Sequence, residues 1–175
     1  MTKDRILELM QKTTADVEFA QQVSNEIVQE NIAELDALMR EIQDHVVNVQ
    51  YADDQTISNY FLQLTNALYF LNTRCENFGF YDDITKANAR LKYNEAYAEN
   101  QLLHANDSKK PTQNDNQLYA EMNSVDENVL NLIYSRSVRI IKGKLEGASE
   151  MVRTLSKILS VRTNGNMTSS RRLYE

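Results

Sequence analysis

Apolar residues recur at alternating spacings of four and three over two long stretches of this chain. The first stretch covers residues 28–49 and the second covers residues 57–78. This alternation is typical of helices that pack along a narrow seam, as in coiled coils and helical bundles. The seam residues are Val28, Ile32, Leu35, Met39, Ile42, Val46 and Val49 in the first stretch, and Ile57, Phe61, Leu64, Leu68, Leu71, Cys75 and Phe78 in the second. The pattern predicts an all-α fold.

Few residues in the sequence favour turns. The 175 residues include four glycines and one proline, and a β-rich or α/β chain would normally use more, because these residues supply the backbone angles of tight turns. Helices over 14–50 and 113–162 would each extend about 55 to 75 Å, too far to bury their seams inside a compact monomer. We therefore expect elongated helical hairpins in a coiled-coil-type bundle that assembles as a homo-oligomer.

We predict a single helical domain over residues 1–163. Its helices are expected at 3–12, 14–50, 55–78, 83–104 and 113–162. The segment 105–112 contains the only proline and no apolar residue larger than alanine, so we expect an exposed, mobile loop there. The tail 164–175 combines turn residues and small polar residues with two arginines, and we expect it to be disordered.

Capping residues set several of these boundaries. Thr112 and Asp115 have the spacing of a capping box at a helix start. Gly79 is placed to form a left-handed cap at the end of the second long helix. The acidic pairs 53–54 and 82–83 each precede an expected helix, where a carboxylate satisfies free N–H groups. We favour this interpretation of both pairs over acid–base chemistry or a divalent-metal site.

The apolar pattern is less regular in the second half of the chain. The helix over 83–104 has a weaker stripe, formed by Ile84, Ala87, Leu91, Ala98 and Leu102. The last helix carries two runs that are out of phase: Leu118, Met122, Val125, Val129 and Leu132, and then Val138, Ile141, Leu145, Ala148, Val152, Leu155 and Leu159. Continuing the first register would place Arg136, Arg139 and Gly143 in the seam. We therefore expect the chain to change face, kink or meet a different partner there.

No constellation of residues identifies a reaction. His45 and His104 lie on different elements without cysteine or acidic residues at metal-ligand spacing, so we expect no metal site. Cys75 occupies a seam position, where a thiol behaves as a small hydrophobic residue. The sequence contains no glycine-rich phosphate loop, nucleophile elbow or HExxH motif. We predict a protein that is not an enzyme and needs no cofactor.

The same sequence suggests a compartment. A single cysteine cannot form an intramolecular disulfide, and the N-terminal residues lack the uninterrupted apolar core of a secretory signal. No apolar run approaches the roughly 20 residues of a membrane-spanning helix. We expect a soluble protein with no membrane partner in a reducing compartment, which is the cytoplasm.

The charges are distributed unevenly along the chain. Residues 1–134 contain 10 Lys and Arg against 22 Asp and Glu, and residues 135–175 contain 9 against 3, so a balance of −12 precedes one of +6. The basic residues of the last segment are Arg136, Arg139, Lys142, Lys144, Arg153, Lys157, Arg162, Arg171 and Arg172. These residues match the acidic part of the same or a neighbouring subunit, lie on a solvated helix surface, or contact phosphates. An oligomer would combine several weak phosphate contacts into useful affinity.

A second basic feature lies on the helix over 83–104. Two cations and two aromatic residues share one face at positions i, i+4, i+7 and i+11, namely Lys86, Arg90, Tyr93 and Tyr97. Cations suit phosphates and unstacked bases can lie on aromatic rings, so the face suits a single strand without sequence preference. The alternative is a solvated helix face whose tyrosines cover hydrophobic neighbours.

This helix also contains the string Ala89-Arg90-Leu91-Lys92-Tyr93. ARLKY, followed by a polar loop and a long helix, resembles the LKARLDY motif of the UvsY family of phage recombination mediators. Asn88 stands where the family has a lysine, and Lys92 stands where it has an aspartate. The last helix, with KLEGASEMVRTLSKILSVRT, is similar in character to the C-terminal helix of that family.

The resemblance implies a factor without catalytic activity that forms a ring-like homo-oligomer, binds single-stranded DNA and helps to load a recombinase onto DNA coated by single-strand-binding protein. It implies a phosphate contact for Arg90 and a role in packing or assembly for Leu91 and Tyr93. With the helical face and the basic segment added, the candidate nucleic-acid-binding residues are Lys86, Arg90, Lys92, Tyr93, Tyr97, Arg136 and Arg139. The alternative function is a helical structural or assembly adaptor that binds no nucleic acid.

Overall fold

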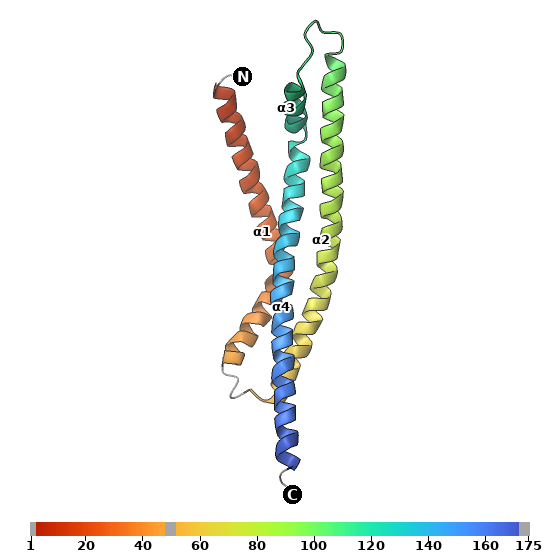
Figure 1. Cartoon of the computed structure of the whole chain (residues 1–175). Helices are drawn as coiled ribbons and strands as arrows, with labels where there is room; N and C mark the ends of the chain where they lie inside the picture. Colours follow the sequence, from red (N-terminus) through yellow and green to blue (C-terminus); the bar gives the residue numbers. More distant parts are fainter. Residues whose placement is uncertain (1–2, 48–51, 172–175) are drawn as a thin grey trace. The chain divides into compact units, whose positions relative to one another are not determined.

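The computed structural model describes residues 3–47 and 52–171, with side chains over 14–45 and 52–163. Four α-helices follow one another along the chain (Figure 1): α1 (Lys3–Val47), α2 (Asp54–Leu103), α3 (Gln113–Asn123) and α4 (Val125–Arg171). The predicted all-α fold is confirmed, and no strand occurs in the described ranges. Within the same ranges, no helix is long and apolar enough to cross a membrane.

The three long helices are shared between two compact units. Unit 1 comprises Met1–Ile27 and Glu76–Arg139, and unit 2 comprises Val28–Cys75 and Ile140–Glu175. The sequence alone predicts a single domain over 1–163. Each of the two units receives part of α1, part of α2 and part of α4, whereas α3 belongs to unit 1 alone.

Unit 2 has an interior of large apolar side chains. Among the side chains that the structure describes in unit 2, all buried residues but one belong to the predicted seams, because long heptad runs on three helices have enough apolar area to cover one another. The exception is Tyr60, whose hydroxyl donates a hydrogen bond to the Glu41 carboxylate at 2.9 Å. The buried residues are Val28, Ile32, Leu35, Ile42, Ile57, Tyr60, Leu64, Leu71, Cys75, Ile141, Ala148 and Leu155.

Unit 1 has an interior of small and polar side chains. Its buried residues are Ala20, Ser24, Thr85, Ala89, Ala96, Asn100, Asn116, Ala120, Ser124, Ile133, Ser137 and Val138. Hydrogen bonds between helices satisfy polar members of this interior. The Asn100 amide donates to the Asn116 carbonyl oxygen at 2.7 Å, and the Ser137 hydroxyl donates to the Ser24 hydroxyl at 3.1 Å. These pairs join α2 to α3 and α4 to α1.

The predicted boundary between helices 55–78 and 83–104 is wrong, because α2 is continuous from Asp54 to Leu103. Gly79 does not adopt the left-handed conformation, since no glycine in the described residues has a positive φ. Asp82 does not cap a helix start. Its carboxylate instead accepts hydrogen bonds from Asn131 and Ser135 on α4. Contacts with another helix thus replace the local turn that the sequence suggested.

Three other boundaries differ from the prediction. α1 runs through residue 13 without the expected break. The helix predicted over 113–162 is interrupted at Ser124, which separates α3 from α4 and whose backbone N–H donates to the Glu121 carbonyl. α4 then continues through 143 without a break and extends to Arg171, so the helix includes residues 164–171 of the predicted tail. The rest of the predicted tail, 172–175, lies outside the described residues.

The caps predicted at two helix starts are confirmed. Thr112 and Asp115 form the capping box of α3, after the non-helical segment between α2 and α3. The Asp53 carboxylate accepts a hydrogen bond from the Thr56 backbone N–H at 2.6 Å at the start of α2. These hydrogen bonds favour the charged carboxylates, and they hold the pKa values of Asp53 and Asp115 below the usual value of 3.8.

Candidate nucleic-acid interface

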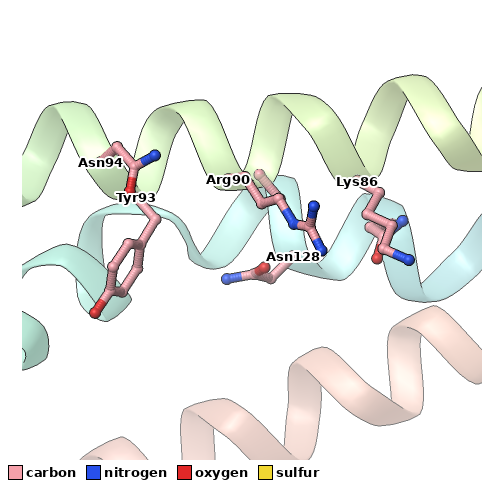
Figure 2. Close-up of a pocket in the computed structure, with 7 residues that line it drawn as sticks. Lys86, Arg90, Tyr93, Asn94 and Asn128 are labelled. Atoms are coloured by element: carbon pink, nitrogen blue, oxygen red, sulfur yellow. The ribbon is translucent and has the colours of Figure 1, made fainter.

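One surface hollow of unit 1 brings together three of the residues predicted to bind nucleic acid. The hollow has a volume of about 430 Å³ and lies between α2 and α4. Figure 2 shows Lys86, Arg90 and Tyr93 projecting from α2 into it, with Asn128 of α4 beneath Arg90. Its other lining residues are Ala89, Asn94 and Asn131. The three predicted residues share the hollow because spacings of four and three keep them on one face of the helix.

Tyr97, the fourth residue of the predicted face, continues this surface along α2. Its ring stacks on the ring of Tyr93, with centroids 6.4 Å apart and an angle of 25° between the ring planes. Both side chains are partly exposed. A pair of nearly parallel rings beside two cations offers an apolar platform next to positive charge.

The wall contributed by α4 is polar and held in place by hydrogen bonds. The Asn131 amide donates to the Asp82 carboxylate at 3.1 Å and to the Thr85 hydroxyl at 3.3 Å. The Asn128 amide donates to the Ser124 hydroxyl at 3.2 Å. These hydrogen bonds fix two carboxamide groups at the rim. The hollow is therefore suited to a polar ligand.

The two cations of the hollow are available for a ligand. Lys86 and Arg90 are both exposed, and neither forms an ion pair with any described side chain. The acidic group one turn before Lys86, Asp82, already accepts hydrogen bonds from Asn131 and Ser135. An anion that contacted both cations would replace water and would not have to displace an internal partner.

The remaining predicted residues lie outside the hollow. Lys92 is exposed, but it follows Arg90 by two positions and so points about 200° away around the helix. Arg139 is exposed on α4 and Arg136 is partly buried on the same helix. The Nε atom of Arg136 is buried without a hydrogen-bond partner among the described residues. Lys86, Arg90, Tyr93 and Tyr97 thus form one surface, which Lys92, Arg136 and Arg139 do not join.

Part of the basic C-terminal segment pairs with acidic residues of the chain itself. The Lys144 ammonium lies 2.8 Å from the Asp36 carboxylate, and the Arg162 guanidinium lies 3.0 Å from the Asp54 carboxylate. Both pairs connect α4 to other helices of unit 2. For these two cations the intramolecular interpretation of the basic segment is confirmed. Arg171 lies among residues whose side chains are not described, and Arg172 lies outside the described residues.

The histidines have local partners. The ring nitrogen Nδ1 of His45 lies 3.1 Å from the Tyr60 hydroxyl, and that of His104 lies 2.6 Å from the Asp107 carboxylate. Burial, together with the hydrogen bond to Glu41, raises the pKa of Tyr60. Over the side chains that the structure describes, no group of three or more His, Cys, Asp or Glu residues is placed to hold a metal ion.

Sequence reasoning missed the asparagines of the hollow. Asn94 follows Arg90 by four residues, so its position on the same face could have been recognised from the spacing. Asn128 and Asn131 come from another helix, and only the pairing of α2 with α4 brings them to the site. The asparagines were missed because the face was selected by its cations and aromatic residues, and an amide side chain is neither.

The chain matches no protein family, no curated protein and no solved structure.

Proposed function

We propose that this protein binds single-stranded DNA through the hollow of unit 1 and acts as a non-catalytic recombination mediator. The observation that supports the proposal is the meeting of Lys86, Arg90 and Tyr93 in one hollow of about 430 Å³. Phosphates would contact the two cations. Bases would stack on Tyr93 and Tyr97, whose rings extend the same surface.

A single strand fits this chemistry better than a duplex. Aromatic stacking needs bases that are unpaired and able to turn outward, whereas a duplex presents mainly its phosphates. The hollow offers few cations, so one copy of the chain would contact few phosphates and bind weakly. In a homo-oligomer, several copies of the hollow on one strand would raise the affinity without new contacts.

The mediator role rests on the resemblance of ARLKY to the UvsY motif. In that role the protein would hold the strand while a recombinase replaces single-strand-binding protein. The relevant assay measures recombinase filament formation on coated single-stranded DNA, with and without this protein. Faster assembly supports the mediator role, whereas strand binding without any effect on assembly limits the function to DNA binding.

The direct test is the binding of fluorescently labelled oligo-dT at two salt concentrations. We expect association at low salt that weakens as salt rises, because binding releases counterions from the strand. Arg90→Ala should lower the affinity and reduce the log–log slope of affinity against salt by about 0.7 for each phosphate that the variant no longer neutralises. Absence of binding at low salt would contradict the proposal and favour a structural adaptor.

Lys92→Ala is the matched control, since Lys92 is an exposed cation on the same helix outside the hollow. It should change the affinity much less than Arg90→Ala or Lys86→Ala. Tyr93→Ala should weaken binding by about 1 to 3 kcal/mol if a base stacks there. Equal reductions in affinity from Lys92→Ala and Arg90→Ala would show that net charge matters and the hollow does not.

A further inference from the structure

The part of α2 in unit 1 has its apolar face turned outward. Its buried positions are small or polar and lie on one side of the helix: Thr85, Ala89, Ala96 and Asn100. At about 100° per residue, the apolar residues fall within an arc of about 60° on the opposite side. We call them the outer α2 stripe: Phe80, Ile84, Ala87, Leu91, Ala98 and Leu102. In most amphipathic helices the apolar side is buried and the polar side is exposed, whereas here the apolar side is exposed.

Nothing in the described part of unit 1 covers the outer α2 stripe. Phe80 is 63% exposed, Leu91 58% and Leu102 76%. In Figure 1 the green part of α2 has α3 and α4 along one side and no ribbon along the other. An exposed apolar stripe of this length is unusual on the free surface of a monomer and is typical of an interaction site.

We propose that the outer α2 stripe is an interface with a second copy of this chain, formed by parallel pairing of the two α2 helices. The proposal rests on the homo-oligomer assumed in the proposed function and names the surface that would form it. The stripe has heptad spacing, with Ile84, Leu91 and Ala98 at position a and Phe80 and Ala87 at position d. A seam with this spacing packs best against a helix that has the same spacing.

Charges beside the stripe favour the parallel arrangement. Arg90 occupies position g and Glu95 occupies position e of the following heptad. In a parallel pair, a g residue lies against the e residue of the next heptad on the other helix. Arg90 of each copy would therefore lie near Glu95 of the other copy, giving two pairs related by symmetry. Arg90 also lines the hollow, so this contact would compete with the phosphate contact assigned to it in the proposed function, and Lys86 would be the cation of the hollow that assembly leaves unpaired. An antiparallel pair that placed Leu91 against Ala87 would put Arg90 against Arg90.

Asn94 adds a reason for an in-register pair. It occupies position d between Leu91 and Ala98, so it interrupts the apolar stripe. In a parallel, in-register pair each Asn94 meets its own counterpart, and the two amides can bond to each other. A shift of one heptad would place one Asn94 opposite Ala87, where its amide has no partner, and the other opposite Gln101, so the in-register pair is the arrangement in which the two Asn94 amides meet each other.

Sedimentation velocity of the full chain tests the proposal. Leu91→Asp should raise the apparent dissociation constant of the assembly at least about tenfold, because it places a charge in the seam. The control is Leu62→Asp, because Leu62 is also on α2 and is exposed to the same 58%, but belongs to unit 2. Unchanged circular dichroism would verify that both variants fold. Equal assembly of Leu91→Asp and Leu62→Asp would overturn the proposal.

A charge exchange tests the parallel arrangement. Arg90→Glu and Glu95→Arg should each weaken assembly about tenfold or more, since each brings like charges together in both symmetric pairs. The double variant should recover most of the affinity. If the double variant assembles no better than the single variants, the parallel pairing is wrong.

Oligo-dT binding, measured separately, distinguishes this proposal from the proposed function. A wild-type chain that stays monomeric at tens of micromolar but binds oligo-dT overturns the interface and leaves DNA binding in place. A chain that assembles through the outer α2 stripe but binds no oligo-dT supports the interface and contradicts the proposed function.

Discussion

Unit 1 and unit 2 share the same three long helices but have opposite interiors. Every buried polar residue in the described part of the chain lies in unit 1, whereas the buried residues of unit 2 are apolar apart from the hydroxyl of Tyr60 and the thiol of Cys75. Exposed apolar side chains have the opposite distribution between the two units. Most of the exposed large hydrophobic residues, including Phe80, Leu91 and Leu102, lie in unit 1.

This difference has an energetic consequence. Burial of a large apolar side chain contributes about 1.5 to 3 kcal/mol, whereas a hydrogen bond between polar groups contributes about 0.5 to 1.5 kcal/mol net. We therefore expect unit 2 to contribute more to the stability of the monomer than unit 1. Unit 1 gains less from its own interior and keeps apolar surface for other molecules, as is common for regions that bind partners.

The largest effect is expected from removing a core residue of unit 2. Leu64 is fully buried, so Leu64→Ala should lower the free energy of unfolding by about 2 to 5 kcal/mol, because apolar burial is reduced and a cavity remains. Urea denaturation followed by circular dichroism measures this change. Leu130→Ala, at a half-exposed position in unit 1, is the control and should cost less than about 1 kcal/mol. Similar destabilisation in both variants would remove the contrast between the units.

The next effect concerns the buried amide pair of unit 1. Asn100→Ala leaves the Asn116 amide buried without its partner and should cost about 1 to 3 kcal/mol. Replacing both asparagines by leucine should be close to neutral or stabilising, because neither polar group is then left unpaired. Urea denaturation of the single and double variants checks this. A double variant less stable than Asn100→Ala would show that the pair does more than satisfy its own hydrogen bonds.

A smaller effect is expected from the ion pair between Lys144 and Asp36 in unit 2. The Lys144 side chain is 42% exposed, so solvent screens the interaction and the coupling should be at most about 1 kcal/mol. A double-mutant cycle with Lys144→Ala and Asp36→Ala measures it. A coupling well above that value would mean that charge pairing, in addition to apolar burial, holds unit 2 together.

The smallest effect should appear on acidification. Hydrogen bonds lower the pKa of Asp53 in unit 2 and of Asp115 in unit 1. Each cap therefore stabilises the fold above the usual pKa of 3.8, and this contribution disappears as the pH falls through the lower folded-state value. Asp115→Asn should reduce the acid-induced loss of amide-exchange protection in α3. The same variant should leave the acid-induced loss of protection at the start of α2, near Asp53, unchanged. Protection of α3 that follows pH equally in the variant would contradict this assignment.

The sequence predicted unit 2 well and unit 1 poorly. Heptad runs such as Ile57, Leu64 and Leu71 are long and apolar, and hydropathy alone identifies their buried face. In unit 1 the most apolar face, which contains Leu91, is exposed, while Asn100 is buried. Hydropathy could not reveal this arrangement, because Asn100 is stabilised by a partner on another helix.

The candidate site was predictable in part. Helical spacing placed Lys86, Arg90 and Tyr93 on one face, and the structure brings them into one hollow. Asn128 and Asn131 could not be added from spacing, since they reach the hollow only through the packing of α4 beside α2. The helix boundary wrongly predicted between residues 78 and 83 has a similar cause. Asp82 has the sequence context of a helix cap, but its carboxylate accepts hydrogen bonds from Asn131 and Ser135 on α4, which local sequence does not reveal.

The unit boundaries fall after residues 27, 75 and 139, inside α1, α2 and α4. Cleavage of the chain at a unit boundary would therefore interrupt a helix and break its backbone hydrogen bonds. The segment 104–112 offers another place, since it is non-helical and largely exposed. A chain opened there would yield one fragment with α1 and α2 and another with α3 and α4. Neither fragment would contain a complete unit, so their reassociation would have to rebuild both units together.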